Sequence, residues 1–302
     1  MHILPSFKNI WNILYNFQAK TILKVLPFKI PKPKNDFLII QEDKQWVFYD
    51  KLHQHQEVQL SYIVSGTGTL IVGDTVNRFT EGDVIVLGTN LPHVFQSDSP
   101  ATKSSYMLSV FFNETLFWEK FFEIEEIKNL RSFFNRSNSG FKVLHPTRAL
   151  RETFTKILNT SKLERFALFF ELLQKLHSSR KEELSTFQIN KRFSDVEGKR
   201  MGVIFDYIIQ NFQQEITLEQ IAKEASLTKT AFCRFFKTRT NKTFYQFLIE
   251  LRLEHVCRLL RQESKELITD IAFQSGFNSV SNFNRYFKKV KGMSPLEYRK
   301  LN

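Results

Sequence analysis

The pattern of apolar and polar positions changes once along the chain, near Asn113. Before it, from about Phe37, short apolar runs such as QLSYIV, GTLIVGD, DVIVLG and YMLSVFF are separated by turns that contain Gly, Asn or Asp. Short strands at such intervals are typical of an antiparallel barrel or sandwich. Glycines punctuate these runs, where tight turns need positive φ: Gly66, Gly68, Gly73, Gly82 and Gly88. The pattern therefore predicts an N-terminal β-barrel.

After Asn113 the apolar residues recur three and four positions apart, which indicates amphipathic helices. The two helical segments are LFWEKFFEIEEIKNLRSFF and ALRETFTKILNTSKLERFALFFELLQKLH, with a turn-rich break, NRSNSGFKVLHPT, between them. The apolar stripes of these helices are wider than is needed to cover the apolar surface of a small barrel. Residues 113–178 are therefore a candidate for self-association, as a homodimer. The charged, weakly periodic stretch 179–200 is predicted to be a linker.

From residue 201 onward the pattern predicts helices, and it repeats. The segments ITLEQIAKEASLTKTAFCRFFKTRTNKTFYQFL and LITDIAFQSGFNSVSNFNRYFKKVKGMSPLEYR align with an offset of fifty residues, which rises to fifty-one inside the third element. Ile221 pairs with Ile271 and Phe236 with Phe287 in this alignment. Two copies of one supersecondary unit explain the repeat.

Each copy has the anatomy of a helix-turn-helix, with a short helix, a turn and a second helix. In the first copy Thr217 begins a capping box and Thr228 can cap the second helix. In the second copy Gly276 supplies the turn, and Asn278 or Ser279 caps the helix that follows. The repeat therefore predicts an all-α domain of two helix-turn-helix units.

The second helix of each unit sorts its residues by face. Aromatic residues at helical spacing point to the core: Phe232, Phe235 and Phe236, and in the second unit Phe283, Tyr286 and Phe287. Arg and Asn on an outer face can read guanine and adenine, and Lys can neutralise phosphate. The alternative is a solvated face, which the repetition disfavours. The outer faces carry Lys229, Thr230, Cys233, Arg234 and Lys237, and Val280, Ser281, Asn284, Arg285 and Lys288.

The segment FYQFLIELRLEHVCRLLRQ between the copies predicts a helix of about eighteen residues, or about 27 Å at 1.5 Å per residue. Such a spacer can hold two recognition helices near one DNA turn apart, about 34 Å. One chain could then reach two successive major grooves on the same side of a duplex.

The charge of the chain agrees with a polyanion partner. The formal net charge is +12, from 43 Lys and Arg against 31 Asp and Glu. From Lys199 onward there are 18 basic and 10 acidic residues, a net of +8, which leaves 25 and 21, a net of +4, for the rest. A basic excess in one domain is typical of nucleic-acid binding.

Two further features bear on location. The two cysteines, Cys233 and Cys257, lie far from any CxxC spacing, which argues against disulfides or structural zinc and favours the cytoplasm. No stretch of eighteen apolar residues occurs, so we expect no transmembrane helix. The first twenty residues are interpreted as a short amphipathic helix packed on the body, with membrane association as the lesser alternative.

The run DIAFQSGFNSVSNFNRYFKKVKGMSPLEYRK closely resembles the C-terminal signature of AraC/XylS-family transcription regulators. The first copy and the helix LRLEHVCRLL resemble the rest of that domain, so the resemblance covers about 100 residues. It implies double-stranded DNA as the partner, with RNA polymerase as a further candidate. Because Cys233 and Val280 cannot make strong bidentate contacts with bases, we expect Arg234 and Arg285 to contribute most of the base recognition. The resemblance implies base contacts from Thr230, Cys233 and Arg234, and from Val280, Ser281, Asn284 and Arg285.

The N-terminal region carries candidate ligand-binding residues. If LHQHQEVQL is a strand, then His53, His55, Glu57 and Gln59 share one face. The later segment EGDVIVLGTNLPHVF adds His93. Together the two segments resemble the two motifs of the cupin barrel, which many AraC-type regulators carry as a sensor domain.

Metal-binding cupins have a Glu where this chain has Gln59, and a neutral amide is a poor ligand for a divalent ion. We therefore predict no metal or other cofactor. A pocket for a small-molecule effector that uses the three histidines, Glu57 and Gln59 is the leading interpretation, and a purely structural polar cluster is the alternative.

The predicted fold is an α+β multidomain protein. Residues 1–112 form an N-terminal arm and a cupin-like antiparallel β-barrel, 113–178 a helical appendage, 179–200 a linker and 201–302 the two helix-turn-helix units. The predicted function is that of an effector-controlled, non-enzymatic transcription regulator. The rival is a metal-dependent cupin enzyme with an appended helical domain. The chain lacks a nucleophile motif and a phosphate loop, and only the rival predicts bound metal and turnover that a chelator abolishes.

Overall fold

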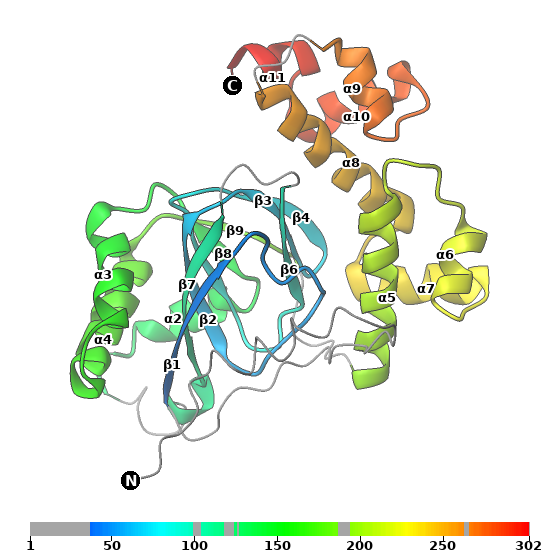
Figure 1. The fold of residues 1–302 in the computed structure, drawn as a ribbon. Coiled ribbons are helices and arrows are strands. Elements are labelled where there is room, and N and C mark those ends of the chain that lie inside the picture. Colours follow the sequence, from blue (N-terminus) through cyan, green and yellow to red (C-terminus); the bar gives the residue numbers. More distant parts are fainter. Residues whose placement is uncertain are drawn as a thin grey trace.

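A computed structural model of the chain describes residues 37–98, 104–117, 124–125, 127–186, 194–262 and 266–301. The predicted N-terminal helix lies outside these residues. Figure 1 shows a β-barrel with one group of helices on one side and a second, larger group on the other. Within the described ranges, no helix is both long and apolar enough to cross a membrane.

The barrel consists of two antiparallel sheets. The six-stranded sheet has the order β1-β7-β2-β5-β8-β9, and the three-stranded sheet the order β4-β3-β6. The strands that the apolar runs predict are all present. The bounds are β1 (Leu38–Gln45), β2 (Val58–Ser65), β3 (Gly68–Val72), β4 (Thr75–Phe79), β5 (Val84–Leu87), β6 (His93–Ser97), β7 (Ser105–Phe112), β8 (Phe141–Val143) and β9 (Lys181–Glu183).

Alternation along the strands creates two apolar layers. On β5, Val84 and Val86 face outward and join an apolar cluster with the helices on that side. Ile85 and Leu87 face the other way and join the cluster that fills the barrel. Both sides of β5 are thus buried, which is why DVIVLG reads as a continuous apolar run.

Three helices cover the outer face of the six-stranded sheet (Figure 1), and a short 3-10 turn follows β7. Phe154 and Phe169 are fully buried there. Thr147 and Ser161 cap the two longer helices, the second in a complete capping box. The elements are η1 (Glu114–Phe117), α2 (Leu130–Ser137), α3 (Arg148–Leu158) and α4 (Lys162–Ser178).

Two strands differ from the sequence expectation. Phe141–Val143, inside the predicted turn-rich break, forms β8 and pairs with β5. Lys181–Glu183, inside the predicted linker, forms β9 and pairs with β8. A strand of three residues is too short to show alternation, so the existing sheet edge decides its conformation.

The remaining helices form two units joined by α8, which belongs to both (Figure 1). Phe205, Phe236 and Phe247 of the first unit lie in the same apolar cluster as the barrel interior. Phe283 and Phe287 lie in a separate cluster of the second unit. The bounds are α5 (Asp195–Asn211), α6 (Leu218–Glu224), α7 (Lys229–Thr240), α8 (Phe244–Arg261), α9 (Ile268–Gln274), α10 (Val280–Lys291) and α11 (Pro295–Leu301).

The predicted turns and caps of the two units are largely confirmed. Thr217 forms the capping box of α6, and Thr228 caps α7. Ser279, and not Asn278, caps α10. Gly276 has a φ of +88°, as the turn requires. Asn278 is the extra residue that raises the repeat offset from fifty to fifty-one, and it lies in the turn before α10, not inside the third element as the sequence alignment placed it.

Candidate DNA-binding surface and barrel site

The outer faces of α7 and α10 are open to solvent. Buried aromatic residues, Phe232 and Phe236 on α7 and Phe283 and Phe287 on α10, fix the inner faces. The sequence-predicted contact residues are all exposed apart from Val280, which is half-buried: Lys229, Thr230, Cys233, Arg234, Lys237, Ser281, Asn284, Arg285 and Lys288.

The charges on the two faces have different partners. Lys229 forms an ion pair with Glu219 on α6, and that hydrogen bond raises the pKa of Lys229. Arg285 donates from Nη2 to Asn282 Oδ1 at 3.2 Å, and its guanidinium lies 4.9 Å from the Tyr286 ring centre. In the part of the chain that the structure describes, Arg234 makes no ion pair or hydrogen bond, so its fork of N–H donors points to solvent.

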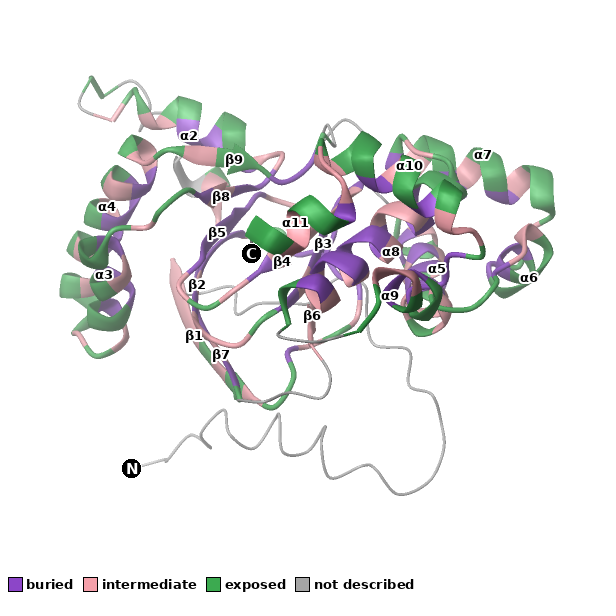
Figure 2. Cartoon of the chain, turned by 90° about the horizontal axis from the view of Figure 1, so that it is seen from above, coloured by how far each residue is buried: buried purple, intermediate pink, exposed green. Residues whose placement is uncertain are grey.

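The two faces are held at a distance by α8. This helix has 18 residues, which corresponds to about 27 Å. Seen from above, α7 and α10 lie along one edge of the molecule (Figure 2). The arrangement presents two basic helices on one side.

The polar residues of the barrel gather around three histidines. The ring centres of His53 and His93 are 4.3 Å apart, and those of His55 and His93 are 5.1 Å apart. The predicted regular strand through residues 53–57 is not present; His53 instead forms an isolated bridge with His93, and β2 begins at Val58. The histidines therefore come together through this bridge between His53 and His93, and not because they alternate along one strand.

Hydrogen bonds fix the rings. The Nδ1 atoms of His53, His55 and His93 each lie 2.8 Å from a backbone carbonyl oxygen, to which each donates. His55 Nε2 lies 3.0 Å from Gln59 Oε1, and Gln59 Nε2 donates to Ser61 Oγ at 2.8 Å. The Ser61 and Ser109 hydroxyls are 2.9 Å apart and fully buried.

Ser61 and Ser109 extend this polar network into the barrel, and the sequence analysis missed them. A signal was available for Ser61, which stands two positions after Gln59 in β2 and so shares its face. Ser109 is placed opposite Ser61 by the pairing of β2 with β7, which no local pattern reveals.

These side chains do not fit a divalent metal. His55 Nε2 is engaged by Gln59, whichever way the amide is turned, and so is not available as a ligand. The carboxylate oxygen Glu57 Oε2 lies 3.9 Å from His55 Nδ1, the atom that already donates to a carbonyl. Among the described residues, no group of three or more His, Cys, Asp or Glu side chains could hold a metal ion.

The barrel interior and the first helical unit belong to one apolar cluster, and charged side chains add further contacts between the barrel and the helices. Asp98, which follows β6, accepts a hydrogen bond from Arg78 Nη2 at 2.6 Å and lies 3.8 Å from Arg258 Nε on α8. Burial alone would raise the pKa of Asp98, but Arg78, Thr67 and Arg258 together outweigh burial and lower it. Lys51 Nζ lies 3.3 Å from Asp206 Oδ2 on α5.

Comparison with known proteins agrees with this architecture. The helix-turn-helix domain model matches residues 221–301, and the cupin domain model matches residues 47–111. The uncharacterized HTH-type transcriptional regulator YdeC of Bacillus subtilis (strain 168) is 25% identical over 261 residues, which cover 84% of this chain and 87% of the relative. The melibiose operon regulatory protein of Escherichia coli (strain K12) is 34% identical over 96 residues, 32% of each chain.

A solved structure of ToxT from Vibrio cholerae is 15% identical, with a TM-score of 0.34 over 87% of this chain and 98% of that one. A cupin barrel followed by two helix-turn-helix units defines a class of DNA-binding transcription regulators. Within that class, the chain is a transcription regulator of the AraC family with a cupin domain, as the signature in its sequence predicts.

Proposed function

We propose that α7 and α10 of one chain read two successive major grooves of a DNA duplex. The observation that carries this proposal is the matched pair of exposed faces, each with an arginine at the same position of its helix, along one edge of the molecule. The length of α8, about 27 Å, suits helices that enter grooves one turn apart.

The residues divide into two roles. Arg234 and Arg285 read guanine through two hydrogen bonds each, and Asn284 reads adenine in the same way. Lys237 and Lys288 neutralise phosphates and contribute affinity without sequence preference. The remaining positions complete the two contact surfaces by shape and single hydrogen bonds: Lys229, Thr230, Cys233, Val280 and Ser281.

The barrel, in this proposal, binds a small-molecule effector and has no catalytic role. His53, His55, His93, Glu57 and Gln59 supply hydrogen-bonding groups next to an apolar interior, a combination that suits small-molecule recognition. Effector binding acts on the DNA-binding units if the effector prefers one packing of the barrel against them. The Asp98–Arg258 and Lys51–Asp206 contacts are where such a change would be transmitted.

We also propose that the regulator is a cytoplasmic homodimer that acts with RNA polymerase at promoters. The start of α4 leaves Leu163 exposed to 82% and Phe166 to 41%, one turn apart on the same face. Association through this face covers both side chains. Light scattering that finds only monomer at working concentrations contradicts the dimer.

The test of the main proposal begins with selection of binding sites from random duplexes by the full-length protein. Arg234→Ala and Arg285→Ala are each expected to weaken binding to the selected site by ~1–3 kcal/mol and to relax preference at one base pair. Binding to random duplexes should change far less. Arg261→Ala on α8, whose guanidinium contacts Tyr298 and Glu254, is the matched control. Equal losses on selected and random DNA contradict the assignment.

A further inference from the structure

The two helix-turn-helix units have separate apolar cores. The buried residues of α8 in the first core end at Leu251, and those in the second core begin at Leu253. Because no single core spans both units, their relative orientation depends on α8, on which both cores pack, and on the contacts at the junction. Polar contacts lie at the junction between the two cores.

Arg252 binds the first unit from α8. Its Nε donates to the Phe212 carbonyl at 2.7 Å, and its Nη2 donates to the Gln214 carbonyl at 2.7 Å. Both carbonyls belong to the loop between α5 and α6. Burial lowers the pKa of Arg252, and the two carbonyl bonds offset part of the cost of removing its guanidinium from water.

The same loop contacts the turn of the second unit. Gln213 Nε2 donates to the Gln274 carbonyl at 3.0 Å. The Phe212 ring lies 5.1 Å from the His255 ring, centre to centre, and His255 Nδ1 lies 2.9 Å from Ser275 Oγ. Ser275 donates to the Ile271 carbonyl, so it accepts from His255. The loop is thus held between α8 and the turn that leads into α10.

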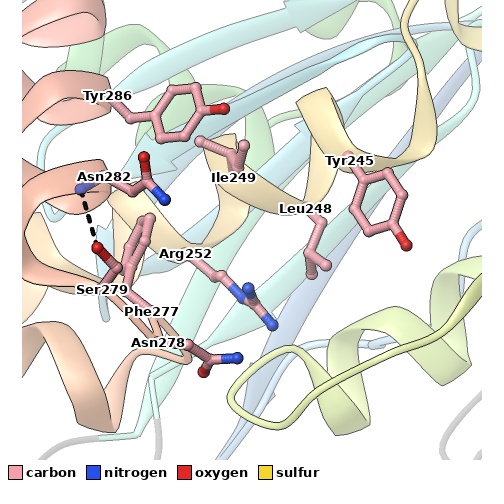
Figure 3. Close-up of a pocket in the computed structure, with 9 residues that line it drawn as sticks. All are labelled: Tyr245, Leu248, Ile249, Arg252, Phe277, Asn278, Ser279, Asn282 and Tyr286. Carbon is pink, nitrogen blue, oxygen red and sulfur yellow. Dashed lines mark hydrogen bonds between the residues drawn. The ribbon is translucent and has the colours of Figure 1, made fainter.

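Gly276 allows this close approach. A Cβ at that position would lie 2.5 Å from the Phe212 carbonyl oxygen and 2.7 Å from Arg252 Nε. Next to this contact, a pocket of about 210 Å³ lies between α8 and the start of α10, lined by Arg252, Asn278 and Asn282 among others (Figure 3). Side chains leave that space open, so apolar packing is incomplete at this point of the junction.

We propose that these contacts form an inter-unit clamp that fixes the angle between the recognition helices α7 and α10 at the distance that α8 sets. The clamp consists of Arg252, His255, the 212–214 loop and the 274–276 turn. Its consequence for DNA rests on the proposed two-groove reading: a fixed angle makes affinity depend steeply on the spacing of the two half-sites. The residues of the clamp are positioning residues and do not touch DNA.

The first test needs no DNA. Cys233 on α7 is exposed, whereas Cys257 is buried and burial raises the pKa of its thiol, so a spin label reacts at Cys233. With Ser281→Cys as the second labelling site on α10, pulsed dipolar spectroscopy of the full-length protein reports the distance distribution between the helices. The unmodified clamp should give one narrow distance. Arg252→Ala should broaden the distribution at least about twofold.

Two further variants keep the test decisive. Arg261→Ala removes an arginine of the same helix that contacts Tyr298 and Glu254, both within the second unit, and should leave the distance narrow. Gln213→Ala removes one clamp hydrogen bond from an exposed position and decides the matter if Arg252→Ala does not fold. A folded Arg252→Ala, or failing that Gln213→Ala, with the unmodified distance distribution overturns the proposal.

The second test uses the selected duplex with one base pair inserted between its two half-sites. The unmodified protein and Arg261→Ala should lose at least about tenfold in affinity, and Arg252→Ala less than about threefold. Equal losses in all three overturn the role of the clamp in DNA spacing. A selected site with one half-site only overturns the two-groove reading instead, and the spin-label result then decides the clamp by itself.

Discussion

The two helix-turn-helix units have separate cores of the same pattern, but their turns differ. Both bury a pair of phenylalanines from the recognition helix, Phe232 and Phe236 in one and Phe283 and Phe287 in the other. At the matching turn position the first unit has Ser226, exposed with a φ of +53°, and the second has Gly276, buried with a φ of +88°. The first turn faces solvent, whereas the second packs against the other unit. The turn of the helix-turn-helix motif therefore accepts a serine where it faces solvent and has a glycine where it packs against the other unit.

The strongest way to break this comparison is to give both turns the same side chain. Gly276→Ala adds a Cβ that meets the Phe212 carbonyl at 2.5 Å and forces a left-handed conformation on Ala. We expect a loss of about 3 kcal/mol in the free energy of unfolding, measured with urea. Ser226→Ala, at the matching exposed position, should lose less than about 0.5 kcal/mol. Similar losses at both positions contradict the distinction between the two turns.

His255 gives the second unit a pH dependence that has no counterpart in the first. Burial, with the nearby Arg258 charge, lowers the pKa of His255 from 6.5 to about 4. Its neutral ring donates to Ser275 and accepts from Arg258 Nη2 at 2.7 Å. Because the folded pKa is the lower one, the stabilisation is complete above about pH 6.5 and is lost as pH falls toward 4.

Between pH 7 and pH 5 the loss should be about 2 kcal/mol, read as the difference in unfolding free energy between the unmodified protein and His255→Gln. Other groups titrate in both proteins and cancel. A difference that stays constant across this pH range contradicts the neutral, buried state of His255.

Lys288 and Arg285 separate affinity from specificity within the second unit. Lys288→Ala should lower affinity for all duplexes alike and reduce the salt slope by about 1, because one phosphate contact is lost. Arg285→Ala should instead reduce the preference for the selected site. Titrations of both variants at several salt concentrations make the comparison. A sequence-dependent effect of Lys288→Ala would assign it to base reading.

The smallest expected effect is a gain in stability from a substitution in the turn of the first unit. Ser226→Gly removes the strain of a serine at positive φ in an exposed turn, and should stabilise the protein by about 0.5 kcal/mol. Thermal unfolding at fixed pH measures it. Destabilisation would show that the Ser226 side chain contributes to the turn.

The repeat explains why so much of the helical region could be predicted. Caps and turn residues such as Thr217, Thr228 and Gly276 interact with residues close to them in the sequence, so their roles can be predicted from the sequence. The short strands β8 and β9, Ser109 and the contacts of Arg252 could not be predicted, because each depends on residues far along the chain. Gln59 could be interpreted only in part: the sequence shows an amide in place of a metal-binding carboxylate, but only the structure shows the hydrogen bond between Gln59 and His55.

The central claim is that one chain reads two successive major grooves. Protection of guanine N7 from methylation on the selected duplex tests it most directly. The account predicts two protected major-groove segments about 10 base pairs apart on one face, with Arg234→Ala exposing one segment and Arg285→Ala the other. A single protected segment, or loss of the same segment in both variants, contradicts it.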